Sequence, residues 1–258
     1  MGADYPSRIV CLSAEAVEVL FLLDCGDRIV GVTGFAVEPP EARKKPRVSG
    51  FSTFDYEKID ALEPEVVITF SDVQGAAAQE LIRRGHTVLA TNQRSIAEIY
   101  ETILVIGRLV QHENEALGLI ERMQGEIRKV VSSGKRPRVY FEEWDEPMIS
   151  GICWVSELIE AAGGEDIFGE FRERKSARER VVKTNEVIER QPDIIIASWC
   201  GKKPDLDAIR DRPGWSKIPA VRDGHVYEID SAHILQPGPG VLKGLRQMRE
   251  IVMQARAV

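Results

Sequence analysis

Several features that would point directly to a function are missing from this 258-residue chain. No apolar run reaches the roughly 18 residues of a membrane-spanning helix, so the chain is not expected to span a membrane. The first residues, MGADYPSRIV, show no basic segment followed by an apolar one, and the sequence as written therefore predicts no signal peptide. We expect a cytoplasmic protein, or a periplasmic or cell-surface one if a leader has been removed.

The chain also lacks an excess of basic residues and a recognisable cysteine spacing. The formal net charge is -7, and a chain without a basic excess cannot neutralise phosphates, which argues against a nucleic-acid partner. The four cysteines show neither CxxC nor zinc-ligand spacing, so free thiols are expected. A P-loop, a GxGxxG motif and a Ser-His-Asp arrangement are absent from the sequence as well, which disfavours several classes of enzyme.

What the chain does contain is an internal echo. The segments Tyr56 to Phe70 (YEKIDALEPEVVITF) and Thr184 to Trp199 (TNEVIERQPDIIIASW) align when shifted by 128 residues. Each has a short helical stretch, a proline, an acidic residue and a β-branched run. Proline ends a helix, and an unbroken Val/Ile run indicates a strand buried on both faces of a parallel sheet. Two halves of one α/β design predict two lobes, with function expected in the cleft between them.

The order of elements supports the same organisation. Strand and helix patterns alternate in both halves, which predicts an α/β fold of two lobes, each with a parallel-rich sheet flanked by helices. A helical region opens at Ser95, where Glu98 completes a capping box, and a break is predicted near residues 110–112. We expect one long rigid helix to join the lobes, giving domains 1–110 and 135–258 around a connecting helix at 111–134.

Several segments, taken in order, resemble one protein family. RIVCLSAEAVEVLFLLDCGDRIVGVTGF, PPEARKKPRVSGF and DALEPEVVITF resemble the first lobe of the class III (helix-linked) periplasmic substrate-binding proteins of ABC importers, and WVSELIEAAGGEDIF, the echo segment and VYEIDSAHILQPGPG resemble the second lobe. That family handles cobalamin, iron-siderophores and haem. EEWDEPMISGICWVSELIEAAGG is most similar to its cobalamin-binding branch. The resemblance implies a shallow cleft between two lobes, a cobalamin-like corrinoid ligand, no required cofactor and no catalysis.

The resemblance also implies a membrane partner. Family members usually present an acidic residue on each lobe to arginines of an ABC permease. Here the candidates are Glu80 in the first lobe and Asp205 and Asp207 in the second. A soluble corrinoid carrier is the alternative to a role in import.

Candidate ligand contacts follow from the expected topology. Ligands of open parallel sheets bind beyond the carboxyl ends of the strands, and a corrin, with an apolar ring and amide arms, calls for flat aromatic side chains and a few hydrogen-bond donors. Arg178 is a candidate for anionic arms. The predicted ligand-binding residues are Phe35, Phe54, Phe70, Ser71, Trp144, Trp154, Trp199, Cys200, His233 and Arg178.

Some of these residues have a second interpretation. Trp154 precedes an apolar helix and fits core packing slightly better, and Phe70 fits core packing equally well. His233 is a candidate axial ligand to a metal, although a hydrogen-bonded loop histidine is the commoner role. Two other functions stay open. One is iron-siderophore or haem binding, and the other is a chelatase-like tetrapyrrole enzyme in which His233 would act with Glu143 or Asp145.

Overall fold

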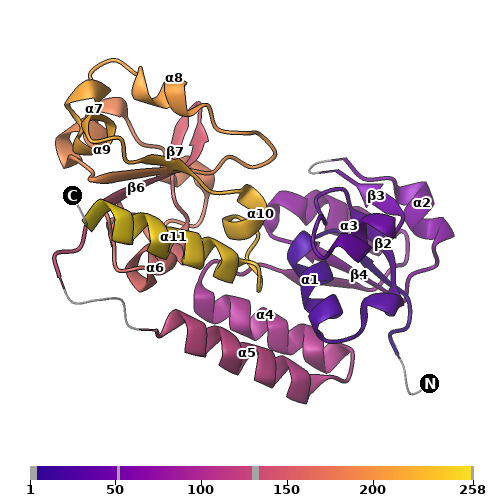
Figure 1. The fold of residues 1–258 in the computed structure, drawn as a ribbon. Helices are drawn as coiled ribbons and strands as arrows, with labels where there is room; N and C mark the ends of the chain where they lie inside the picture. Colours follow the sequence, from indigo (N-terminus) through magenta and orange to yellow (C-terminus); the bar gives the residue numbers. More distant parts are fainter. Residues whose placement is uncertain (1–4, 51–52, 130–133, 257–258) are drawn as a thin grey trace. The chain divides into compact units, whose positions relative to one another are not determined.

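The computed structural model describes residues 5–50, 53–129 and 134–256. The chain divides into two compact units, residues 1–123 and 124–258, and each unit is built around one five-stranded sheet (Figure 1). All strand pairs are parallel except one pair in the second sheet. The predicted fold class, two α/β lobes with parallel-rich sheets flanked by helices, is therefore confirmed.

Strands and helices alternate along the first unit. Its elements are β1 (Ile9–Cys11), α1 (Ala14–Leu22), β2 (Ile29–Thr33), β3 (Arg47–Ser49), α2 (Tyr56–Ala61), β4 (Val66–Phe70), α3 (Gly75–Arg83), β5 (Val88–Thr91) and α4 (Ile96–Leu109), followed by α5 (Glu113–Ile127), which crosses the unit boundary.

The first sheet has the strand order β3-β2-β1-β4-β5, and all of its pairs are parallel. The carboxyl ends of all five strands therefore meet at one edge. From β1 the chain builds outward to β2 and β3, and it then crosses to the other side for β4 and β5. The strand order thus reverses between β1 and β4, and ligands of such sheets bind at this switch point, beyond the carboxyl ends.

The second unit begins with its longest strand. Its elements are β6 (Arg138–Asp145), β7 (Met148–Ser150), α6 (Cys153–Ala161), β8 (Glu165–Asp166), α7 (Thr184–Arg190), β9 (Ile194–Ala197), α8 (Leu206–Arg210), α9 (Pro219–Arg222), β10 (Val226–Glu228), α10 (Ser231–Ile234) and α11 (Val241–Arg256).

Strand β6 organises the second sheet. It pairs in parallel with β9, which pairs in turn with β10, while β8 lies parallel to its start and β7 antiparallel to its end. The chain completes β7 and β8 beside β6 before it crosses to β9. The switch point of this sheet consequently lies between the carboxyl ends of β6 and β9.

The sequence echo has a structural cause. Its acidic residue follows the proline and receives hydrogen bonds from the backbone that enters the neighbouring strand. The Glu65 carboxylate accepts from the amides of Ser7 (2.6 Å) and Arg8 (3.1 Å), next to β1. The Asp193 carboxylate accepts from the amide of Arg138 (2.8 Å), at the start of β6. Each echoed carboxylate therefore fixes the amino-terminal end of the strand beside its own.

The sequence correctly predicted where α4 begins and where the helical region is interrupted. Ser95 and Glu98 form the predicted capping box of α4, and the predicted break falls between the end of α4 at Leu109 and the start of α5 at Glu113. The expected connecting helix, 111–134, contains the 15 residues of α5, and residues 130–133 of that range lie outside the described residues. Its role as a rigid connection stays a prediction.

Two local expectations were wrong. The apolar run at residues 138–141 predicts a strand that ends at Phe141, with Trp144 in the polar loop after it. Instead, β6 continues to Asp145 because β7 pairs with its end. His233 was expected in a loop, and it lies instead in the short helix α10, which begins where the Asp230 carboxylate accepts a hydrogen bond from the Ala232 amide (2.8 Å).

Candidate functional site

The switch point of the first sheet is held together by one side chain. Beyond the paired residues of β1 and β4, the Leu12 amide donates to the Ile68 carbonyl (2.8 Å). The buried Gln74 side chain then donates from Nε2 to the Leu12 carbonyl (2.9 Å) and accepts at Oε1 from the Phe70 amide (2.9 Å). The loops that follow the two strands therefore keep a fixed spacing.

Two predicted ligand contacts, Phe70 and Ser71, lie at the end of β4. The half-buried Phe70 ring has the Arg94 guanidinium 5.6 Å from its centroid, and Arg94 also pairs with the exposed Asp72 carboxylate (2.6 Å). Ser71 is buried and has φ 60° and ψ 174°, a backbone conformation that residues other than glycine rarely adopt. Strained residues of this kind concentrate at functional sites, which is consistent with the position of Ser71 at the switch point.

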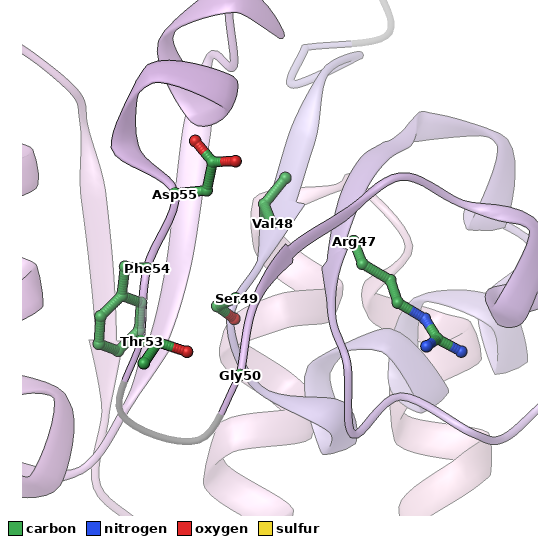
Figure 2. A pocket seen from close by; sticks show the side chains of 7 residues that line it. All are labelled: Arg47, Val48, Ser49, Gly50, Thr53, Phe54 and Asp55. Carbon is green, nitrogen blue, oxygen red and sulfur yellow. The ribbon is translucent and has the colours of Figure 1, made fainter.

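The other two predicted phenylalanines lie at the same edge of the sheet, on the side of β3. Phe54 forms a single bridge with Ser49 and lines a cavity of about 300 Å³, shown in Figure 2. Phe35 follows β2, where the Gly34 amide donates to the Ser49 carbonyl (2.7 Å). The cavity is at the lower end of the range for ligand pockets. The residues that line it are Arg47, Val48, Ser49, Gly50, Thr53, Phe54 and Asp55.

At the end of β6, three acidic residues each have a basic partner. Glu142 is fully buried and pairs with Arg212 through two bonds (2.5 and 2.9 Å). Glu143 pairs with the buried Arg180 (2.6 and 3.0 Å). Each of these two carboxylates therefore has a guanidinium as its hydrogen-bonding partner.

The third acid, Asp145, belongs to a group with two indoles. Its carboxylate pairs with the Lys202 ammonium (2.6 Å), which lies 5.3 Å from the Trp144 ring centroid and 4.6 Å from that of Trp199. Trp144 is half-buried, whereas Trp199 is only 3% exposed and packs in the core of the second unit. One cation thus links the two predicted tryptophans, at the ends of β6 and β9.

With the exception of Cys200, the remaining predicted contacts of the second unit lie apart from this group. The indole of the buried Trp154 donates to the Ile234 carbonyl (2.8 Å) in α10. On the same short helix, the half-buried His233 has its Nδ1 3.4 Å from Nε2 of Gln247. Arg178 is exposed and makes no described contact with the indoles, whereas the exposed Cys200 directly follows Trp199 in the chain. Trp215 is fully buried, as expected for a packing residue.

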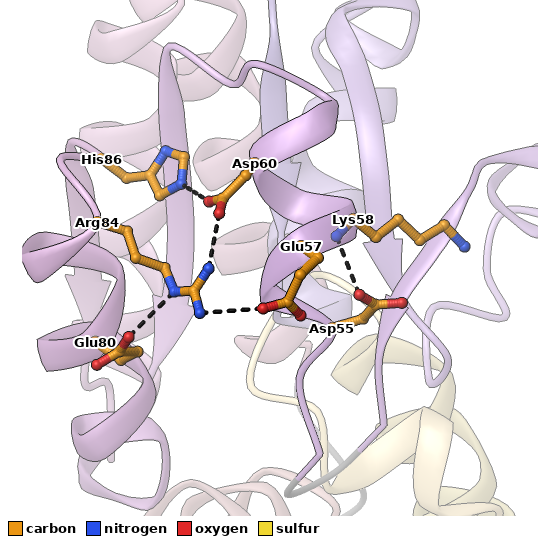
Figure 3. A network of polar contacts seen from close by, with 7 residues as sticks. All are labelled: Asp55, Glu57, Lys58, Asp60, Glu80, Arg84 and His86. Carbon is orange, nitrogen blue, oxygen red and sulfur yellow. Dashed lines mark hydrogen bonds and ion pairs between the residues drawn. The ribbon is translucent and has the colours of Figure 1, made fainter.

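The acidic residues predicted to contact a permease differ in their exposure and in their hydrogen-bonding partners. In Figure 3, Glu80 pairs with Arg84 (3.1 Å), which also contacts Asp60 and Glu57. Asp205 caps α8 by accepting from the Ala208 amide (3.0 Å). Asp207 is 88% exposed on its side chain and pairs with Arg210 one turn away.

Some residues at these edges were missed by sequence reasoning. Buried polar atoms without a hydrogen bond among the described residues include Oγ of Ser13 after β1, Oε1 of Glu15 in the first turn of α1 and Oγ of Ser198 after β9. Lys202, Arg212 and Gln74 were also missed. The sequence does contain a signal for Glu15, because every residue of AEAVEVLFLL except Glu15 and Glu18 is apolar.

The described residues contain neither a membrane-spanning helix nor a cluster of metal ligands. Across residues 5–50, 53–129 and 134–256, no helix is long and apolar enough to cross a membrane. Over these residues there is also no group of three or more His, Cys, Asp or Glu side chains placed to hold a metal ion. A single axial ligand such as His233 stays a prediction.

Comparisons with known proteins agree with the observed fold. An uncharacterized ABC transporter substrate-binding lipoprotein of Bacillus subtilis is 27% identical over 96% of this chain and 80% of its own length. A vitamin B12-binding protein of Vibrio parahaemolyticus is 23% identical over 97% of this chain and 90% of its own. The solved structure of a periplasmic heme-binding protein from Roseiflexus covers 96% of this chain and 98% of its own, with a TM-score of 0.80 at 21% identity.

A family profile decides the assignment. The profile described as periplasmic binding protein matches residues 9–233, which includes both sheets and both switch points. Solute-binding proteins of this kind are carriers, and the relative from Bacillus subtilis is named as the substrate-binding lipoprotein of an ABC transporter. The chain belongs to the periplasmic binding protein family and is a solute-binding protein of the ABC-import type.

Proposed function

We propose that the ligand is a corrinoid such as cobalamin and that residues at the carboxyl ends of strands contact it. The observation that carries the proposal is the pair of indoles, Trp144 and Trp199, at the ends of β6 and β9. Indole faces supply flat apolar area suited to a corrin ring, at little cost in side-chain entropy. The vitamin B12-binding relative supports the same ligand. Contact with Trp199 requires a rotamer change of Lys202, whose side chain is about half exposed.

The same region supports a carrier rather than an enzyme. A catalytic base must itself be free to accept a proton from the substrate. Glu142, Glu143 and Asp145 are instead each engaged by Arg212, Arg180 and Lys202. The ring neighbour of His233 is the Gln247 amide, so the acid–base pair proposed for a chelatase is not assembled within the second unit as described.

The ligand assignment predicts a change in melting temperature. Adding cyanocobalamin or cobinamide should alter the ligand's visible absorption spectrum and raise the melting temperature of the chain. At 100 times its Kd, a ligand that binds only the native state adds about 2.7 kcal/mol, which corresponds to roughly 5–10 °C for a chain of this size. Trp144→Ala should weaken binding about tenfold, as expected for a central aromatic contact.

The control for that variant is Trp215→Phe, which changes a fully buried indole of the same core that lies beside Arg212 rather than Lys202. Each variant is compared with its own ligand-free melting temperature. Absence of any shift with both corrinoids would refute the assignment.

Haem is the second candidate. The half-buried imidazole of His233 can ligate an iron atom, and the heme-binding protein from Roseiflexus shares the fold. Titration with haem distinguishes the candidates, because axial ligation by His233 would give a Soret shift that His233→Ala removes. Ferric hydroxamate siderophores form a third arm of the same screen.

For the permease, we favour Glu80 and Asp207 as the contact residues of the two units. Asp207 has the more exposed side chain, and its bond to Arg210 lies on the protein surface, where such pairs contribute little to stability. The Asp205 carboxylate is committed to the start of α8, so its replacement would also weaken that helix.

A further inference from the structure

Glu15 is a buried acid without a basic partner at the carboxyl edge of the first sheet. It lies in the first turn of α1, four residues after the end of β1, and is 5% exposed. Its Oε1 atom makes no hydrogen bond to the described residues, and Oγ of Ser13, which is 4% exposed, makes none of good geometry. The two side chains therefore form a polar pair inside an otherwise apolar segment.

Such an acid needs an explanation, because a buried charge is normally paired or neutralised. Glu142, which is also fully buried, follows the rule through its two bonds to Arg212. Glu15 has no such cation among its contacts with the described residues. Burial instead raises the pKa of Glu15 to about 7, although its own backbone amide and the Ser13 hydroxyl lower it. Near neutral pH the carboxyl group can therefore both donate and accept hydrogen bonds.

The position of the pair agrees with a role in binding. Ser13 and Glu15 follow β1, and Phe70 and Ser71 end or follow β4, so these residues flank the switch point of the first sheet. The Gln74 side chain joins the two loops through Leu12 and Phe70, which keeps the polar pair at a fixed place on this edge.

We propose that Ser13 and Glu15 form a subsite for the amide arms of the ligand, and that Glu15 makes this subsite select amide-armed over carboxylate-armed tetrapyrroles. This inference rests on the proposed corrinoid function and deepens it. A primary amide offers an N–H donor and a carbonyl acceptor, which match a carboxyl group and a hydroxyl in either protonation state of Glu15. A carboxylate arm offers acceptors only, and it meets repulsion whenever Glu15 is ionised.

Two corrinoids that differ only in their arms test the subsite. Cobinamide carries amides where cobyrinic acid carries carboxylates, and both are titrated into the full chain and its variants with absorption as the readout. We expect the wild type to bind cobinamide at least about tenfold more tightly, as like-charge contacts predict. Glu15→Gln, which keeps the shape and removes the charge, should reduce this preference several-fold. Glu15→Ala should weaken cobinamide binding by up to about tenfold through the lost hydrogen bonds.

Asp27→Asn is the matched control, since it removes one exposed carboxylate next to the amino end of β2, at the opposite edge of the sheet. It should leave the preference unchanged. Corrinoid binding with equal affinity for both arms, or an unchanged preference in Glu15→Gln, overturns the role of Glu15 while the proposed function stands. Failure of both corrinoids to bind the wild type overturns the proposed function and the subsite together.

Discussion

Ser71 is a single residue with a strained backbone at the carboxyl edge of the first sheet. Its positive φ is fixed by three hydrogen bonds of the turn: its amide donates to the Thr91 carbonyl (2.7 Å), its hydroxyl accepts from the Val73 amide (3.2 Å), and its carbonyl accepts from the Gln74 amide (3.1 Å). A residue other than glycine in this region of φ and ψ costs about 1–3 kcal/mol. The surrounding turn must therefore supply that free energy.

This strain predicts an inverted order of stability for two variants. Ser71→Ala and Ser71→Gly both lose the hydroxyl, but only glycine relieves the backbone, so the glycine variant should have the larger free energy of unfolding, by about 1–2 kcal/mol. Urea unfolding followed by circular dichroism measures the difference. At an unstrained position glycine is the less stable of the two by about 1 kcal/mol, as expected for Ala76→Gly on the exposed face of α3. An alanine variant as stable as the glycine variant would show that the turn is relaxed.

The sequence could predict some site positions and not others. Ser71 and Phe70 follow a recognisable strand, so the rule for carboxyl ends finds them directly. Glu15 follows a strand as well, but a glutamate in a helix is normally solvated, and only the burial of Ala14, Ala16 and Val17 around it shows otherwise. The same rule finds Trp199, but it does not show that the indole packs in the core of the second unit with Lys202 over its ring. Such burial depends on distant packing partners, which a local pattern does not contain.

Among the elements, β6 differs most from its sequence pattern. The run RVYF predicts a strand, whereas the polar letters EEWD that follow predict a loop. The strand continues because β7 pairs with this end and because Arg212, Arg180 and Lys202 neutralise its three acids. These partners come from segments 37 to 70 residues away in the chain. No local propensity could have predicted them.

The partner of Glu142 should be essential to this strand. Glu142 is fully buried and also accepts from the hydroxyl of Tyr140 (3.2 Å), whose pKa is raised by burial and by the Glu142 charge. Arg212→Met leaves the carboxylate unpaired and should lower the free energy of unfolding by about 3–5 kcal/mol. Adding Glu142→Gln to that variant should recover most of the loss, because the second change removes the buried charge.

Denaturant unfolding of the two single variants and the double variant measures this coupling. Arg222→Met is the control, since Arg222 pairs with Asp223 on the surface and its loss should change stability by less than about 0.5 kcal/mol. A double variant as unstable as Arg212→Met would show that Arg212 acts through its packing on Trp215 rather than through its charge.

For the whole molecule, the two units carry different chemistry. All four tryptophans belong to the second unit, where indoles and ion pairs occupy the switch point. The first unit has phenylalanines at its edge, and Ser13 and Glu15 are among its buried polar residues. The duplicated fold could therefore be predicted from the repeated helix, proline and strand. The division between an aromatic and a polar edge could not, because it depends on which side chains the packing leaves without partners.

The pH dependence of the free energy of unfolding should report on the protonation of Glu15. The pKa of Glu15 is raised from 4.5 to about 7 in the folded chain, so the folded state holds more protons than the unfolded state between these values. The contribution of Glu15 to stability is then fully present below pH 4.5 and is lost as the pH rises through 7. A shift of this size corresponds to about 3 kcal/mol. Carboxylates with lowered pKa, such as Glu170 beside Arg190, act in the opposite direction at lower pH.

We therefore expect the free energy of unfolding of the wild type to fall between pH 5 and pH 8, and that of Glu15→Gln to fall much less. The two proteins should be similar near pH 4.5, and the variant should be the more stable one at pH 8 by an amount on the order of 3 kcal/mol. Urea unfolding followed by circular dichroism reports on both units, whereas tryptophan fluorescence reports on the second unit alone. A difference between the proteins that does not change with pH would mean that Glu15 is already ionised in the folded chain, stabilised by a partner that the described contacts do not include.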